Sequence, residues 1–135
     1  MDDATALLRQ RMPLCATLGM RAASAQPSSV ILEMPWDASR CTGAGLLHGG
    51  ALMALADSAG ALLAYLNLPE GASGTTTIES KTNFMRGVRD GVVRAESALL
   101  HAGSTTMVVE TVLTHEGRLV AKVTQTQAVL RPRPA

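Results

Sequence analysis

Aromatic side chains are nearly absent: the 135 residues include one Phe, one Tyr and one Trp, or 2%. The chain also lacks a dense run of Lys or Arg, and its formal net charge is only +1. Proteins that hold single-stranded nucleic acid combine a basic groove with stacking rings, so we expect no nucleic-acid partner. Because 47% of the residues are nevertheless hydrophobic, the core of a single domain must be built from Ala, Val, Leu and Met.

Cysteine is scarce as well. Cys15 and Cys41 stand far apart and lack the spacing of a metal site, so we expect reduced thiols in a cytoplasmic protein and no bound metal. The first ten residues, MDDATALLRQ, begin acidic and are not followed by an apolar run, which does not resemble a signal peptide.

The longest apolar run, Gly49–Leu66, is 18 residues, which is close to the length of a membrane span. It carries Asp57 near its centre, contains Gly60, and has no basic flank. Because a carboxylate is costly in the middle of a bilayer, we predict a buried core helix and no membrane partner.

Periodicity and turn residues predict the other elements. A short helix is expected at residues 3–12, stopped by Pro13, and the C-terminal residues 131–135 (RPRPA) are expected to be a frayed tail. Strands are expected at residues 18–25, 28–35, 75–85, 92–101, 105–114 and 119–130. The pairs Asp90-Gly91, Ala102-Gly103 and Glu116-Gly117 are typical of hairpin turns between the last four strands.

One long helix and five to six strands predict an α+β fold in which an antiparallel sheet wraps around the helix. A helix without a polar face must be enclosed on nearly every side. The sheet covers one side, and a partner subunit is the simplest source of a second surface, so we expect a homo-oligomer.

The triplet His48-Gly49-Gly50 stands where this helix begins. The first turn of a helix has unpaired N–H groups and a partial positive charge, and glycines let a ligand oxygen approach them without meeting a side chain. This arrangement suits an oxyanion, with His48 adding a hydrogen bond or capping the turn. The alternative is that the glycines only allow close packing where the chain enters the core.

Asp57 is the single charged residue of the helix, set among Ala, Leu and Met. A carboxylate there is costly unless something uses it, although a structural role beside a buried Arg or backbone amides is the alternative. His48 and Asp57 are nine residues apart, about 13.5 Å of helix rise, and are expected on opposite faces. If both serve one reacting atom, the site is shared between antiparallel helices of a symmetric dimer.

The segments LLHGGALMALADSA, TTIESKTNFMRG, HAGST and GRLVAKVTQT resemble the hotdog-fold thioesterase superfamily. Within it, the chain is most similar to the PaaI-like (phenylacetic acid degradation-type) acyl-CoA thioesterases, over residues 14–130. The resemblance implies a curved sheet around one central helix, and protomers that form dimers or tetramers as dimers of dimers. It also implies hydrolysis of an aryl- or medium-chain acyl-CoA to the free acid and CoA, without a cofactor.

The same resemblance implies roles for individual residues. His48 would orient the thioester, the Gly49 N–H would polarise its carbonyl, and Asp57 of the facing protomer would act as nucleophile or general base. Thr77 stands where related enzymes carry a hydroxyl near the attacking group.

Binding residues are also implied. Leu47 and Gly50 would line the substrate site together with Thr42, which stands where relatives often have Asn. Arg86 and the loop of Gly103, Ser104 and Thr105 would meet the CoA moiety. Two other functions stay open: a non-catalytic acyl-CoA binder, and a lyase that hydrates an enoyl thioester.

Overall fold

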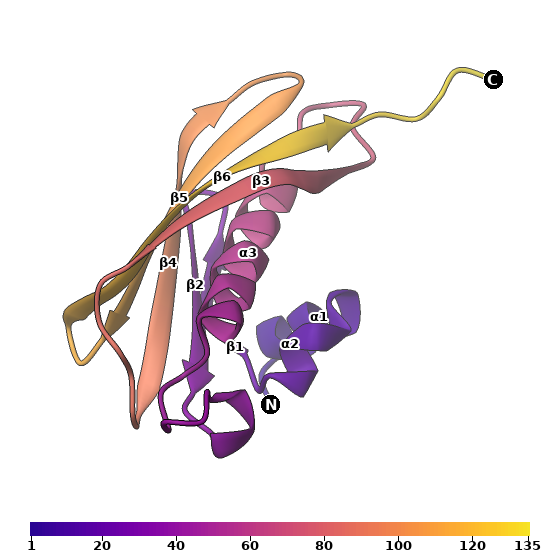
Figure 1. The fold of residues 1–135 in the computed structure, drawn as a ribbon. Helices are drawn as coiled ribbons and strands as arrows, with labels where there is room; N and C mark the ends of the chain where they lie inside the picture. Colours follow the sequence, from indigo (N-terminus) through magenta and orange to yellow (C-terminus); the bar gives the residue numbers. More distant parts are fainter.

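The computed structural model describes residues 1–135, and its main feature is a curved antiparallel sheet with one long helix on its concave face (Figure 1). The helices are α1 (Asp3–Arg11), α2 (Pro13–Thr17) and α3 (Gly49–Leu66), with a short 3-10 helix at Ala38–Arg40. The strands are β1 (Arg21–Gln26), β2 (Ser29–Pro35), β3 (Gly74–Phe84), β4 (Val92–Ala102), β5 (Thr106–His115) and β6 (Arg118–Leu130). Their order across the sheet is β1-β2-β4-β5-β6-β3.

The predicted α+β fold, with six strands and one central helix, is confirmed. The last four strands lie within one residue of their predicted bounds. The first strand begins at Arg21 instead of residue 18, because residues 13–17 form the unpredicted helix α2. Pro13 does end α1, but it also occupies the first turn of α2, where its missing N–H costs nothing.

The expectation of a hairpin at Asp90-Gly91 is wrong. β3 pairs with β6 at the edge of the sheet, whereas β4 lies between β2 and β5. The connection from β3 to β4 instead crosses the end of the sheet. Two hydrogen bonds join it to residues 36–48, which lead from β2 to α3: Leu47 N–H donates to the Val88 carbonyl (2.9 Å) and Trp36 N–H to the Gly91 carbonyl (2.7 Å). Turn residues mark where a chain reverses, but they do not determine which strands pair.

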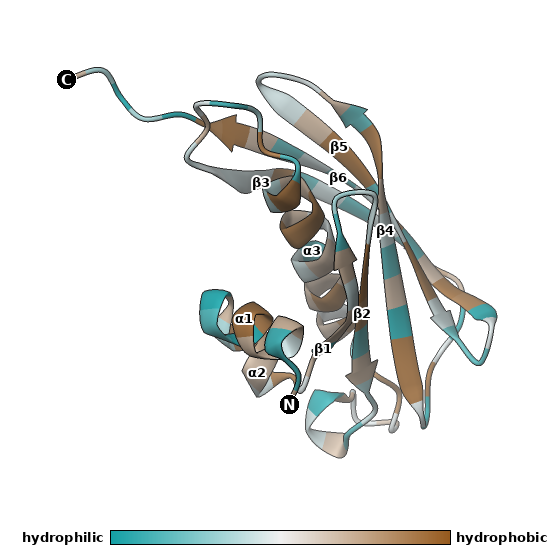
Figure 2. Ribbon diagram, turned by 180° about the vertical axis from the view of Figure 1, so that it is seen from behind, coloured by the Kyte–Doolittle hydropathy of each residue, from teal (hydrophilic) through white to brown (hydrophobic).

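Helix α3 packs on the inner face of the sheet through its small and aliphatic side chains, including the fully buried Leu55, Ala59 and Leu63. Figure 2 shows the alternation of polar and apolar residues along β4 that this packing requires. By length and composition alone α3 could cross a membrane, but half of its residues are buried inside the protein. It is therefore a core helix of this fold.

One side of α3 remains uncovered. We call it the open stripe, and its half-buried or exposed residues recur at helical spacing: Gly50, Met53, Ala54, Asp57, Ala61 and Tyr65. Beside it, β3 forms one edge of the sheet, and its Ile78 side chain is 59% exposed.

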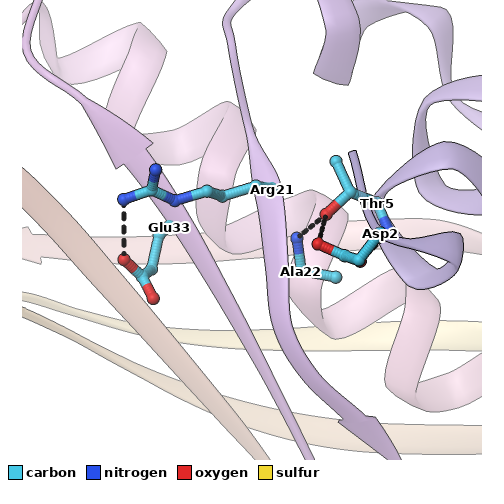
Figure 3. A network of polar contacts seen from close by, with 5 residues as sticks. All are labelled: Asp2, Thr5, Arg21, Ala22 and Glu33. Carbon is cyan, nitrogen blue, oxygen red and sulfur yellow. Dashed lines mark hydrogen bonds and ion pairs between the residues drawn. The ribbon is translucent and has the colours of Figure 1, made fainter.

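Helices α1 and α2 lie on the side of α3 away from β4 and β5 (Figures 1 and 2). A small polar network fastens α1 to β1, as Figure 3 shows. The Asp2 carboxylate accepts from the Thr5 N–H (2.8 Å) and the Thr5 hydroxyl (3.1 Å), which caps α1 and lowers the pKa of Asp2. The Thr5 oxygen in turn accepts from the Ala22 N–H of β1 (3.0 Å).

We expect Thr5→Val to destabilise the protein by about 1–3 kcal/mol, because it leaves the buried Ala22 N–H without an acceptor. Urea unfolding followed by the fluorescence of Trp36 measures this change. The control is Thr17→Val at an exposed position of α2, where little change is expected. Equal stability of the two variants would show that the Thr5 bridge does not fasten α1.

Candidate active site

Asp57 lies in the middle of the open stripe, and one of its two carboxylate oxygens is held from the sheet. Oδ1 accepts from the Thr77 hydroxyl of β3 (2.8 Å) and from the Gln125 side-chain amide of β6 (2.9 Å). Oδ2 accepts from no donor in the protein, yet it is not among the buried atoms that lack a partner. It therefore faces accessible space, free to act on a ligand.

The support of Asp57 continues along the sheet. The Thr77 oxygen accepts from the side-chain amide of Gln127 (2.7 Å), and the Gln127 carbonyl accepts from the Thr75 hydroxyl. A carboxylate can only accept hydrogen bonds, so the Thr77 hydroxyl must donate to Asp57. Thr77 can then accept from Gln127, and Gln127 from Thr75. The predicted proximity of Thr77 to Asp57 is present within one protomer.

Sequence reasoning missed Gln125 and Gln127. Both are buried, at 0% and 1% exposure, on the face of β6 that also carries the core residue Val123. The available signal was the alternation of β6, because two amides at inward positions of a core strand are unusual. In the sequence, Gly60 indicates only that the helix does not span a membrane; in the structure it lies against Gln125.

His48 caps α3. Its Nδ1 accepts from the Gly50 N–H (2.7 Å), so in the neutral ring Nε2 carries the proton and is the free donor. A side chain at Gly50 would come within 2.9 Å of Nδ1, which explains the glycine there.

The expectation that His48 and Asp57 point to opposite faces is wrong. It assumed helical geometry at His48, whose backbone is extended (φ −63°, ψ 134°). The ring therefore turns over Gly50, on the open stripe that also carries Asp57. The ring over Gly50 still lies seven residues before Asp57, about 10.5 Å of helix rise, so one reacting atom cannot meet both side chains of one protomer.

Gly49 provides the free backbone donor at the start of α3. The N–H groups of Ala51 and Leu52 both donate to the His48 carbonyl (2.9 and 3.2 Å), and Gly50 donates to the His48 ring. The Gly49 N–H has no acceptor in the protein. The Phe84 ring at the end of β3 lies over this glycine, since a side-chain carbon there would be 3.1 Å from Phe84 Cζ.

Thr42 and Leu47 lie in the loop that leads to α3, but neither side chain forms a hydrogen bond with the His48 ring. Leu47 is buried in the core at 5% exposure. Thr42 is exposed, and its hydroxyl accepts only from the Ala44 N–H (3.4 Å). His48 is instead oriented by Gly50, so the Thr in place of Asn does not leave the ring without support.

The residues expected to meet CoA lie at opposite ends of β6. The Arg86 N–H donates to the Val120 carbonyl, whereas the Val129 N–H donates to the Thr105 carbonyl of the loop Gly103–Thr105. Nine residues of strand separate these contacts, about 30 Å. Arg86 lies near the start of α3, and the two groups do not form one surface within a protomer.

Two hollows flank Asp57 along the open stripe. One, of about 330 Å³, is bordered by His48, Gly50, Ala54 and Arg40. The other, of about 470 Å³, lies between α1 and the second half of α3, and is lined mainly by apolar side chains such as Leu8, Leu62 and Tyr65. We call the second hollow the α1 groove. It reaches Thr75, the last member of the chain of hydrogen bonds behind Asp57.

Cys15 is the other reactive side chain near this region. Burial raises the pKa of its thiol, more strongly than the Ser58 hydrogen bond and Arg9 lower it, and the Asp57 charge raises it further. A fully buried neutral thiol is a poor nucleophile, so Asp57 is the better candidate for the reacting group.

Known proteins share this architecture. PA1618 of Pseudomonas aeruginosa is 36% identical over 67% of this chain, and the match covers 63% of its own length, slightly less than two thirds. A crystal structure of a single-residue mutant of that thioesterase matches 96% of both chains at 29% identity, with a TM-score of 0.87. A 1,4-dihydroxy-2-naphthoyl-CoA hydrolase of Escherichia coli is 37% identical over 72% of this chain and 71% of its own.

Two further findings agree. The thioesterase HI1161 of Haemophilus influenzae matches at 26% identity, with a TM-score of 0.87, over 97% of this chain and 92% of its own. The family model of the thioesterase superfamily matches residues 44–122, which include α3 and most of the sheet. By sequence and by its hotdog architecture, the chain belongs to the thioesterase superfamily.

Proposed function

We propose that the protein hydrolyses acyl-CoA thioesters, with Asp57 as the reacting carboxylate. The observation that carries this proposal is the state of that side chain: one oxygen is held by two donors, and the other is free on an otherwise apolar stripe. A relative from Escherichia coli is named as the hydrolase of an aromatic acyl-CoA, which supports an acyl-CoA substrate and an aryl acyl group.

A second protomer completes the site in this proposal. The free edge of β3 can pair with its copy, and the open stripes of two α3 helices can then face each other antiparallel. This places His48 and Gly49 of one protomer opposite Asp57 of the other and covers the exposed apolar side chains. Assembly of two such dimers into a tetramer, and a cytoplasmic location, stay predictions.

The chemistry follows from these groups. The Gly49 N–H and the His48 Nε2–H of one protomer polarise the thioester carbonyl and stabilise the oxyanion. Asp57 Oδ2 of the other protomer takes the proton of a water whose oxygen attacks the carbonyl carbon. The intermediate expels the CoA thiolate and leaves the free acid. Alternatively, Oδ2 attacks directly and water hydrolyses the resulting anhydride; only this route can put ¹⁸O from labelled water into Asp57 during a single turnover.

The two ends of the substrate can use surfaces on either side of the reacting carbon. The α1 groove, apolar and adjacent to Thr75, fits a phenyl ring or a medium alkyl chain. Arg86, exposed near the start of α3, is proposed to bind a CoA phosphate. A role for the distant loop Gly103–Thr105 stays a prediction.

We expect Asp57→Asn to lower kcat by about a hundred- to ten-thousandfold, because the amide can neither take a proton nor attack the carbonyl. Thiol release from a panel of aryl- and alkyl-CoA substrates measures this loss. The control is Glu79→Gln, an exposed carboxylate on the same β3 strand, which should retain wild-type activity. Absence of thiol release by the wild type from every substrate would favour a non-catalytic binder.

The shared site predicts complementation between two inactive variants. We expect His48→Ala and Asp57→Asn proteins, unfolded and refolded together, to regain about one quarter of wild-type activity, since half of the dimers are mixed and each has one intact site. If both residues served a site within a single protomer, the mixture would remain as inactive as its components.

If the α1 groove holds the acyl group, filling it should lower activity toward long acyl groups and not toward short ones. We expect Ala61→Phe, which places a ring in the groove, to lower kcat/KM for phenylacetyl- or octanoyl-CoA at least tenfold. Acetyl-CoA, whose acyl group is too short to enter, is the internal control. An equal loss for all three substrates, in a variant with the same oligomeric state as the wild type in size-exclusion chromatography, would place the acyl group elsewhere.

A further inference from the structure

We propose that Gln125 is a positioning residue that aims the Asp57 carboxylate, and that Gly60 exists to hold the Gln125 amide in place. The inference rests on the proposed function, because it concerns how Asp57 is oriented for reaction. Neither residue touches the substrate in this proposal.

The first argument is that the buried Gln125 amide lowers the stability of the fold. Its side chain is fully buried, and its Oε1 has no hydrogen-bond partner. Two nearby hydroxyls on β3, Ser80 and Thr82, are also buried without a partner. A buried polar atom without a partner destabilises a fold, whereas Leu or Met at position 125 would pack without that penalty. The one hydrogen bond of this side chain goes to Asp57, so the amide is explained by what it does for that carboxylate.

The second argument is direction. Because a carboxylate only accepts, Gln125 must present its NH2 group to Oδ1, which turns its own Oε1 away from Asp57. Thr77 donates to the same Oδ1 from a different strand. Two donors from β3 and β6 that meet at one oxygen fix both the position and the plane of the carboxylate. They leave Oδ2 as the only oxygen that can react.

The third argument is confinement. Gly60 lies on α3 one turn after Asp57, and a side-chain carbon there would overlap both Oε1 and Cδ of Gln125. The amide thus fills the space that a side chain at position 60 would take. It is held between the helix backbone and Asp57, so it cannot swing out of its donor position. Gly60 weakens the helix by itself, which this space explains.

The first test is Gln125→Leu. We expect kcat to fall about ten- to a hundredfold, as for the loss of one hydrogen bond to a charged group, with KM changed less than twofold. The melting temperature should change little, because the loss of one donor to Asp57 is offset by the removal of the unpartnered Oε1. The control, Thr111→Val, removes another buried hydroxyl of the sheet, bonded to Ser97, and should leave kcat unchanged.

A second variant separates positioning from packing. The carboxyl of Gln125→Glu has nearly the same shape, but it can donate to Asp57 only when protonated. We expect its kcat relative to wild type to rise as the pH falls, because two adjacent carboxyls share one proton. Cys15, whose thiol lies near Asp57, is unchanged in both proteins. A ratio that stays flat with pH would overturn the positioning role.

The role of Gly60 is tested by a double-mutant cycle. Gly60→Ala should lower kcat in the wild-type background and cause no further loss beside Gln125→Ala, where the overlap is gone. Additive losses would overturn it. If Asp57→Asn is inactive but Gln125→Leu keeps wild-type kcat, this inference fails alone; if Asp57→Asn stays active, the proposed function of Asp57 fails first.

Discussion

The fold depends on covering one helix that has no polar side. Helix α3 is apolar around nearly its whole circumference, so its burial against the concave sheet provides most of the core. The curvature of the sheet, its position around α3, and the placement of α1 and α2 all serve this burial. A single protomer does not complete it, since the open stripe remains partly exposed. The same constraint that stabilises the fold thus leaves one defined apolar surface uncovered.

The polar groups near α3 are few, and they are concentrated on that surface. The Asp57 carboxylate presents Oδ1 to two donors of the sheet and Oδ2 to accessible space. The buried amides of β6 and the threonines of β3 form a polar layer beneath Asp57, while a free backbone N–H lies at the start of the helix. The fold therefore places a fixed acceptor and a fixed donor on an apolar background.

Local patterns in the sequence predicted α3 and the six strands, but neither helix α2 nor the order of the strands, and they located part of the site. Periodicity located α3 and the last four strands, and the isolated charge of Asp57 and the glycines after His48 were visible without a structure. Of the two groups that hold Asp57, the family resemblance indicated Thr77, but Gln125 was missed because it lies 68 residues later and the pairing of β3 with β6 is non-local. The orientation of His48 was also predicted wrongly. The backbone of this capping residue is extended, so a helical wheel does not show where its side chain points. The sequence alone could therefore predict neither which distant strands pair nor where the backbone departs from helical geometry.

Strand β3 contains a bulge: its register against β6 shifts by one residue between Thr77 and Glu79, so that Ile78 is the extra residue. Side chains along a regular strand alternate between faces, so Thr77 and Phe84, seven residues apart, would point in opposite directions. The extra residue in the register between Thr77 and Glu79 shifts the phase by one, so that Thr77 faces Asp57 and Phe84 faces Gly49. Because of this one inserted residue, Thr77 and Phe84 lie on the same face of β3. The strand can therefore both donate to the Asp57 carboxylate and place a ring over Gly49. The bulge in β3 thus determines which of its side chains face α3 at both Asp57 and Gly49.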